Sequence, residues 1–220
     1  MTTRRAMTGR QLFISERIVS AAVLCAVALC VWHAGVSSQP EAAAEERVEE
    51  PKPISAYDDI MRTVGGEYGL DWRLLSAIAH TESRFNPSVV SPRGAVGLMQ
   101  IMPSVGVRLG VAGSELSEPE NNVRVAAMLL KRIESKMKLP PELPDEDRLA
   151  IVLACYHGGS VCVNEARCMA RSRGEEADSW SVVSRCLMQK SRSSGRRTVS
   201  YVRSVMKRYD DYCSESAVRD

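Results

Sequence analysis

The spacing of apolar residues from Ile54 to Tyr212 is helical throughout. Apolar side chains recur every three or four positions, and runs in which apolar and polar residues alternate, as in a half-exposed strand, are nearly absent. Proline and glycine mark the breaks between the periodic segments. We therefore expect one compact all-α domain of about 165 residues, which is a usual domain size. The pattern predicts helices near 54–68, 71–84, 96–102, 119–138, 145–157, 160–173, 178–190 and 196–212.

The first 53 residues have a different pattern. Four arginines precede an apolar run from Ile18 to Trp32, and small and polar residues follow it, which is the layout of a secretory signal. The run is short for a spanning helix, although counting on to Val36 brings it within range. Residues 1–38 are therefore expected to be a cleaved signal peptide or an uncleaved membrane anchor. We expect export to the periplasm or cell envelope, with inner-membrane attachment if the anchor is kept.

An acidic segment separates this run from the helical domain. Residues 39–53 read QPEAAAEERVEEPKP and contain almost nothing that a core would bury. Such a composition is typical of a solvated linker. The predicted organisation is a signal or anchor at 1–38, a linker at 39–53, a domain at 54–213 and a tail at 214–220.

Charge gives no sign of a nucleic-acid partner. Residues 1–40 hold four arginines and one glutamate, so 25 of the 29 basic and 26 of the 27 acidic residues belong to the rest of the chain. A nearly neutral domain lacks the basic surplus that nucleic-acid binding requires. We expect no nucleic-acid partner, no cofactor and a monomer.

Five cysteines lie in the predicted domain. In an exported chain some of them should be oxidised, but their odd number leaves at least one unpaired in a monomer. Pairings cannot be deduced from spacing alone. A metal site that uses some of these thiols with His157 is disfavoured because no C-x-x-C pair is present, so we expect no metal. The cysteines are Cys155, Cys162, Cys168, Cys186 and Cys213.

One acid lies among the apolar positions of the helix predicted at 71–84. On a helical wheel Glu82 falls about 80° from Leu74, between Ile78 and Leu75. A glutamate that bends out to solvent from a fraying helix end is the simple alternative. However, the helix's negative end and the apolar neighbours both penalise the charged form. A carboxyl that stays protonated near neutral pH is what a general acid needs.

The segment after this helix combines glycines with apolar residues. Gly94 and Gly97 allow the backbone to approach a ligand closely, and a short helix is expected to end at Pro103. Met99 by itself reads as core. Gln100 can both donate and accept hydrogen bonds, which suits a sugar hydroxyl or amide, although a buried glutamine that caps backbone groups is the alternative.

These residues resemble a known family. Glu82-Ser83, Gly94-Ala95 and the run GLMQIMP from Gly97 to Pro103 are similar to the catalytic signature of lytic transglycosylases, which have a goose-lysozyme-like fold and cut peptidoglycan. The similarity covers roughly residues 55–212. Within this family, residues 162–187 most resemble the catalytic half of the membrane-bound lytic murein transglycosylases F. The resemblance implies a lysozyme-like helical domain with a substrate groove.

The resemblance also assigns roles to individual residues. It implies that Glu82 is the family's single catalytic acid and base. Substrate-binding or packing positions are implied for Ser91, Met99, Gln100, Tyr156, His157 and Tyr201.

Two positions depart from the family's pattern. His157 stands where the family usually has asparagine, and Arg197 stands where it usually has glutamate. An imidazole can still bind a sugar through hydrogen bonds. An arginine near Glu82 would favour the carboxylate and thereby shift its basicity.

Ordinary glycosidases use two carboxylates, but only one suitably placed acid is found here. Asp71 reads as a helix N-cap, and Glu115, Glu118 and Glu120 suit the start of a helix. By resemblance, Glu82 protonates the linkage between N-acetylmuramic acid and N-acetylglucosamine, and a 1,6-anhydro ring closes without water. A goose-type lysozyme that hydrolyses the same bond remains an alternative, as does a catalytically weak protein that binds peptidoglycan. A specialised enzyme that opens the wall for a larger apparatus would use the same chemistry.

Overall fold

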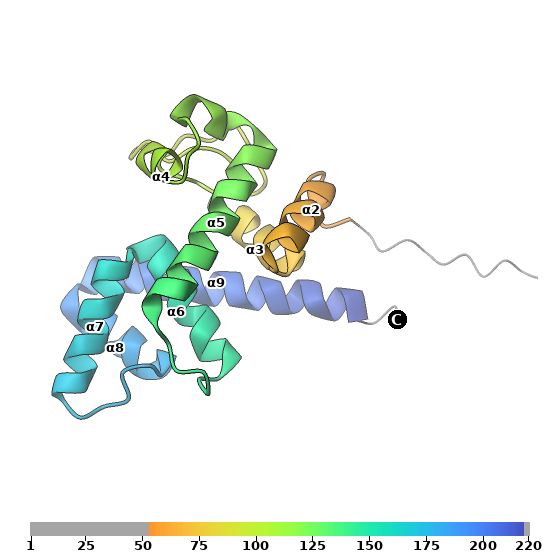
Figure 1. Ribbon diagram of the computed structural model, residues 1–220. Helices are drawn as coiled ribbons and strands as arrows, with labels where there is room; N and C mark the ends of the chain where they lie inside the picture. Colours follow the sequence, from red (N-terminus) through yellow and green to blue (C-terminus); the bar gives the residue numbers. More distant parts are fainter. Residues whose placement is uncertain (1–52, 218–220) are drawn as a thin grey trace, which may run out of the picture. The chain divides into compact units, whose positions relative to one another are not determined.

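The computed structural model describes residues 53–217, with side chains as far as residue 215, and this part is an all-α domain (Figure 1). No strand occurs among these residues; two isolated bridges join Val90 to Val96 and Val96 to Ile101. The predicted fold class is therefore confirmed. The helices are α2 (Asp58–Tyr68), α3 (Trp72–Ser83), α4 (Pro103–Arg108), the 3₁₀ helix η1 (Gly113–Ser117), α5 (Pro119–Met137), α6 (Asp145–Gly158), α7 (Ser160–Ser172), α8 (Trp180–Lys190) and α9 (Arg192–Ala217).

The helix predicted at 96–102 is wrong. This segment is a tight turn between the two bridges, with Gly97 at φ +80° and Gln100 at φ +49°, and neither value belongs to a right-handed helix. The helix begins where it was expected to end, at Pro103, because proline is well suited to the first helical position. Apolar spacing alone does not distinguish such a buried turn from one turn of helix.

The first and last helices also differ from their predicted bounds. Helix α2 begins at Asp58, whose carboxylate accepts hydrogen bonds from the backbone N–H groups of Ile54 and Ser55. These two residues therefore precede the helix. Helix α9 begins at Arg192, four residues earlier than predicted, and includes Gly195, whose Cα packs against the backbone of Leu187.

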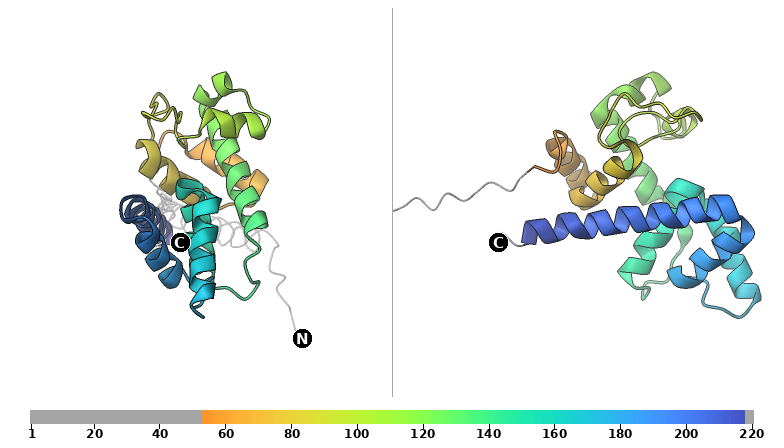
Figure 2. Two further views of the ribbon diagram at one scale, coloured as in Figure 1. Left: turned by 90° about the vertical axis from the view of Figure 1, so that its left-hand side faces the viewer. Right: turned by 180° about the vertical axis from the view of Figure 1, so that it is seen from behind.

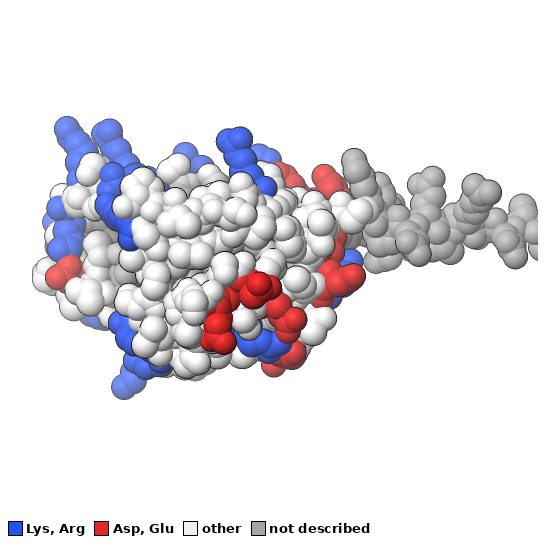
Figure 3. All heavy atoms as spheres, turned by 90° about the horizontal axis from the view of Figure 1, so that it is seen from above, with Lys and Arg blue, Asp and Glu red and all other residues white. Residues whose placement is uncertain are grey.

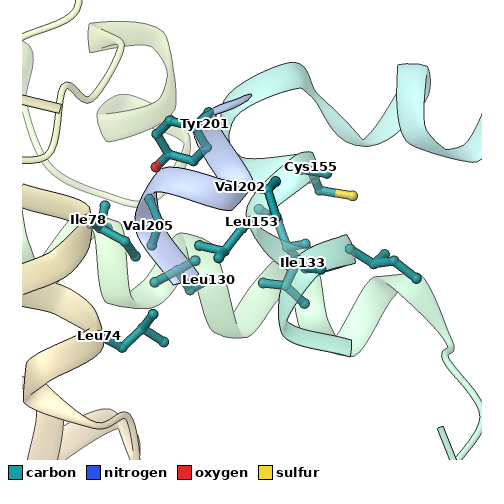
Figure 4. Packing of buried hydrophobic residues seen from close by; sticks show 14 of the residues in the cluster. Leu74, Ile78, Leu130, Ile133, Leu153, Cys155, Tyr201, Val202 and Val205 are labelled. Carbon is teal, nitrogen blue, oxygen red and sulfur yellow. The ribbon is translucent and has the colours of Figure 1, made fainter. Parts of the chain in front are cut away.

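The core lies where α3, α5, α6 and α9 meet. Side chains from all four helices converge there, including Ile78, Leu130, Leu153 and Val205, which are at most 2% exposed (Figure 4). Tyr201 of α9 lies at the edge of this cluster with its hydroxyl turned toward α3. The core thus holds α9 against α3.

The remaining elements lie on two sides of this core. Helix α4, η1 and the loop 84–102 surround the first half of α5, whereas α7 and α8 lie beside α6 and the start of α9 (Figures 1 and 2). The end of α3 lies between these two groups and carries Glu82.

The sequence predictions for residues 1–52 concern a part of the chain outside the described residues. Within residues 53–217, no helix combines the length and the apolar character needed to cross a membrane.

Candidate active site

Helix α3 carries Glu82 in its last turn. The N-terminal end of α3 is capped by Asp71, whose side chain accepts a hydrogen bond from the backbone N–H of Arg73, as predicted for an N-cap. The C-terminal end of α3 is followed by two successive residues with left-handed backbone, Arg84 at φ 54° and Phe85 at φ 63°. Because neither is glycine, this reversal is held by its surroundings.

Ser83 fastens the end of α3 to the loop that follows. Its buried hydroxyl lies 2.8 Å from the carbonyl oxygen of Leu98 and 3.1 Å from that of Ala79. Ser83, the residue next to Glu82, therefore sets the distance between the end of α3 and the loop that contains Leu98. The sequence motif contains this serine, but only the structure gives it a role.

Within the loop, Ser91 and Gln100 bond to backbone groups. The Ser91 hydroxyl accepts a hydrogen bond from the N–H of Ala95 at 3.0 Å. The Gln100 side-chain amide donates to the carbonyl oxygens of Val89 and Gly97 at 3.1 and 3.0 Å. The alternative expected for Gln100, a glutamine that caps backbone groups, is thus the one observed.

Asn122 is a further anchor of this loop. The residue is fully buried near the start of α5, accepts a hydrogen bond from the N–H of Met99 at 2.7 Å, and donates to the carbonyls of Val96 and Leu116. A Cβ at Gly97 would lie only 2.6 Å from its amide nitrogen, so glycine is required there. The sequence analysis assigned no role to Asn122. A buried polar residue opposite a glycine turn was the available signal.

Three aromatic residues cover the site from α6 and α9. The Tyr156 hydroxyl donates a hydrogen bond of 2.7 Å to the carbonyl of Met99, and the Met99 side chain is fully buried. The His157 ring stacks on the Tyr201 ring, with centroids 4.3 Å apart and 16° between the planes. Tyr201 is itself 7% exposed.

Glu82 has an unusually high proton affinity. Burial raises its pKa from the ordinary 4.5 to about 7, and the Tyr201 hydroxyl partly offsets this rise. That hydroxyl is buried near the carboxylate but does not meet the geometry of a hydrogen bond, and it has no other partner among the described residues. Glu82 forms no ion pair within residues 53–217. The predicted direction of the pKa shift is confirmed.

The two tyrosines respond to the same surroundings. Burial raises the pKa of both Tyr156 and Tyr201 well above the ordinary value, and the charge of Glu82 raises it further. Both phenols therefore stay protonated over the range in which Glu82 titrates. The structure thus brings Tyr156, Tyr201 and, through its stacked ring, His157 together with Glu82, whereas Ser91, Met99 and Gln100 shape the adjoining loop.

Arg197 does not act as expected. No cation contributes to the pKa of Glu82, so the anticipated shift in its basicity is absent. Arg197 instead acts on His157, whose pKa is lowered by partial burial of the ring and then by the charges of Arg197 and Arg93. His157 is therefore biased toward the neutral imidazole.

The cysteines and the other titratable groups add no second site. The five cysteines of the described domain are free thiols, so the expected oxidised pairs do not form there. Among residues 53–217, no three His, Cys, Asp or Glu side chains cluster so that they could hold a metal ion.

The described residues form a helical domain in which one half-buried, high-pKa glutamate lies at the end of a helix, and this fold is of the lysozyme-like class. Residues 59–179, more than half of the chain, match the family model described as the transglycosylase SLT domain. The chain belongs to this family, which confirms the predicted resemblance.

Relatives of this chain include proteins with the name membrane-bound lytic murein transglycosylase F. The protein from Alcanivorax borkumensis is 28% identical over 168 residues, which cover 71% of this chain and 35% of the relative. The protein from Pseudoalteromonas translucida is 34% identical over 152 residues, which cover 64% and 32%. The chain therefore matches about a third of the length of these relatives.

Two solved structures share the fold. An inactive mutant of the lytic transglycosylase Slt from Pseudomonas aeruginosa aligns with a TM-score of 0.58 at 20% identity, over 74% of this chain and 24% of that one. The 70 kDa soluble lytic transglycosylase from Escherichia coli aligns with a TM-score of 0.55 at 24% identity, over 76% and 26%.

Proposed function

We propose that this chain is a lytic transglycosylase that cleaves murein with Glu82 as its single acid and base. The observation that carries the proposal is the half-buried Glu82 carboxyl, whose pKa of about 7 leaves it partly protonated at neutral pH. No other carboxylate of residues 53–217 contributes to that pKa. The site therefore suits chemistry in which one group transfers a proton in both directions.

The proposed reaction begins with proton donation. Glu82 protonates the oxygen that joins N-acetylmuramic acid to N-acetylglucosamine, and the C1–O bond breaks while the 2-acetamido group stabilises the cationic carbon. The ionised Glu82 then removes the proton from the C6 hydroxyl, and the C6 oxygen bonds to C1. This closes a 1,6-anhydro ring, consumes no water and returns Glu82 to its acid form.

Two neighbours of Glu82 are proposed to bind substrate directly. The unpartnered Tyr201 hydroxyl lies near the carboxylate, where it can bond to a sugar hydroxyl or to ionised Glu82. His157 stacks on Tyr201 and offers a largely neutral imidazole.

The other candidate residues are proposed to shape the groove. Ser91, Met99, Gln100 and Tyr156 form hydrogen bonds within the loop or to it, and in this way they fix the wall along which the sugar lies.

The location of the enzyme is also a proposal. A lytic transglycosylase needs access to the wall, and a signal or anchor at 1–38 with a linker at 39–53 would place a catalytic domain at 54–213 in the periplasm, followed by the tail 214–220. The F-type relatives are described as membrane-bound, which supports the cell envelope.

Digestion of purified murein sacculi with the full-length chain tests the proposal. We expect soluble muropeptides that end in 1,6-anhydro-N-acetylmuramic acid, each one water lighter than a lysozyme product by mass spectrometry. Reducing muramic acid ends would show a hydrolase instead. Binding to sacculi without release of any fragment would show a peptidoglycan-binding protein.

A further inference from the structure

A cavity of about 200 Å³ lies between α4, α5 and the start of α7. Its apolar wall comes from Val105 of α4, from Leu109 directly after α4, and from Leu129 and Ile133 of α5. Glu82 does not line this cavity, so it is distinct from the site described above.

Three cations line the cavity and no acid does. They are Arg108, Arg132 and Lys136. None of the three side chains forms an ion pair or a hydrogen bond with the residues that the structure describes. Cationic groups that converge on a concave, partly apolar surface attract an anion. Ser160, at the start of α7, adds the positive end of a 13-residue helix.

The basic character of this cavity is local. A second cavity, of about 650 Å³, has the opposite character, with Arg148 as its one cation. Seen from above, Lys and Arg predominate on the left-hand part of the surface and Asp and Glu on the right-hand part (Figure 3). The whole chain has a net charge of only +2, so a surplus of cations does not explain the basic cavity. The acids of the second cavity are Asp71, Glu134, Asp145, Glu146 and Asp210.

The elements that line the basic cavity follow directly in the chain from the two walls of the Glu82 site. Ser160 follows His157 by three residues, so their Cα atoms are at most about 11 Å apart. Helix α4 begins at Pro103, directly after the loop that Ser83 and Asn122 hold against the end of α3. Short stretches of chain therefore connect the lining of the cavity to both walls of the Glu82 site.

We propose that this basic cavity binds a carboxylate of the peptide stem that murein carries on N-acetylmuramic acid. The inference rests on the proposed function, because it takes murein as the polymer bound at Glu82. Peptide stems combine methyl groups, which suit the Val105 and Leu109 wall, with free carboxylates, which suit the three cations. The cavity is smaller than a drug-sized site, as a fragment of a bound polymer requires.

Carboxylates in murein have two sources, the peptide stem and the lactyl group that is exposed when the stem is removed. Two substrates separate them: intact glycan strands, and strands stripped of peptide by an amidase. We compare the full-length chain with its triple variant Arg108→Gln, Arg132→Gln, Lys136→Gln. On intact strands, KM of the variant should rise about tenfold with kcat nearly unchanged, as expected for loss of a charge-assisted contact. On stripped strands the two proteins should be equal.

A matched variant controls for overall charge. Arg192, Arg196 and Arg203 are exposed, share one face of α9, and form no ion pair with the described residues. Their joint replacement by glutamine removes the same charge and should leave KM on intact strands unchanged. An equal rise in KM for this control would overturn the proposal, as would an equal rise on stripped strands or no rise at all for the cavity variant.

Direct binding tests the cavity without catalysis. Titration calorimetry should detect the tripeptide L-alanyl-γ-D-glutamyl-diaminopimelic acid on the full-length chain, and amidation of its carboxylates should abolish the signal. Equal binding of both peptides, or none of either, contradicts the proposed carboxylate site. A chain that cuts neither kind of strand but binds the tripeptide would disprove the proposed activity and leave the cavity assignment intact.

Discussion

The two ends of helix α3 each carry a carboxylic acid, and their environments are opposite. Asp71 begins the helix with an ion pair to Arg73 at 2.7 Å, a backbone hydrogen bond and a hydrogen bond from the Tyr209 hydroxyl at 3.0 Å. Among the described residues, Glu82 forms no ion pair at the end of the helix, and the Tyr201 hydroxyl is the group that lowers its pKa.

Burial acts in the same direction at both ends, but the partners decide the outcome. At Asp71 burial raises the pKa, yet the bonds from Arg73 and Tyr209 outweigh it and the net pKa is lowered. At Glu82 burial is almost unopposed and the pKa rises to about 7. One helix thus holds a structural acid that stays ionised and a reactive acid that keeps its proton.

The largest expected difference between the two ends is in catalysis. Glu82→Gln removes the only proton donor of the proposed reaction, so cleavage of sacculi should fall about 1,000-fold, within the usual range for a general acid. Asp71→Asn, at the other end of the same helix, is the matched control and should retain nearly full activity. Release of muropeptides over time measures both. Comparable turnover by Glu82→Gln and wild type would refute the role of Glu82.

The two acids should also differ in their effect on the free energy of unfolding. Ionised Asp71 stabilises the fold, whereas ionised Glu82 destabilises it. Glu82 titrates at about 7 in the folded chain, above its ordinary 4.5, so ionising it opposes folding. The penalty is absent below pH 4.5, grows between pH 4.5 and 7, and reaches about 3 kcal/mol above pH 7 at about 1.4 kcal/mol per pKa unit.

Urea unfolding at several pH values measures this penalty. Glu82→Gln should be more stable than wild type at pH 8 and equal to it near pH 4. A wild-type chain as stable as the variant at pH 8 would mean that Glu82 ionises without cost.

Helical periodicity was sufficient to predict most of the fold. Helix α5 buries one apolar face, which makes its type and approximate bounds readable from spacing. The segment 96–102 is different, because its apolar residues are buried through a turn held by Asn122 and Tyr156. Contacts that depend on residues far away in the sequence leave no local period.

Part of the candidate site was also predictable from helical periodicity. The position of Glu82 on the apolar face indicated both its burial and its raised pKa. The effect of Arg197 was not predictable, because neighbours in a motif need not be neighbours in space, and its charge acts on His157. The role of Ser83 required the distance to Leu98, which only the fold supplies.

A smaller effect on the free energy of unfolding is expected from substitution of Asp71, the structural acid. Asp71→Ala removes the N-cap bond and the ion pair, and should lower the free energy of unfolding by about 1–2 kcal/mol at pH 7. Because the folded pKa of Asp71 is lowered, its stabilisation is present above the ordinary 3.8 and is lost as pH falls through the folded value. Asp71→Asn should cost less, since asparagine still caps. Equal losses for both variants would assign the stability to the charge alone.

The smallest predicted effect concerns the Tyr201 hydroxyl, which lies near Glu82. The Tyr201 hydroxyl lowers the pKa of Glu82, so Tyr201→Phe should raise that pKa and move the alkaline limb of the activity profile to higher pH. Stability should hardly change, because this buried hydroxyl forms no hydrogen bond of regular geometry with the described residues. Tyr156→Phe is the matched control: its hydroxyl bonds to Met99, so its loss should cost about 1 kcal/mol. An alkaline limb that moves to lower pH in Tyr201→Phe would show that this hydroxyl stabilises the protonated acid instead.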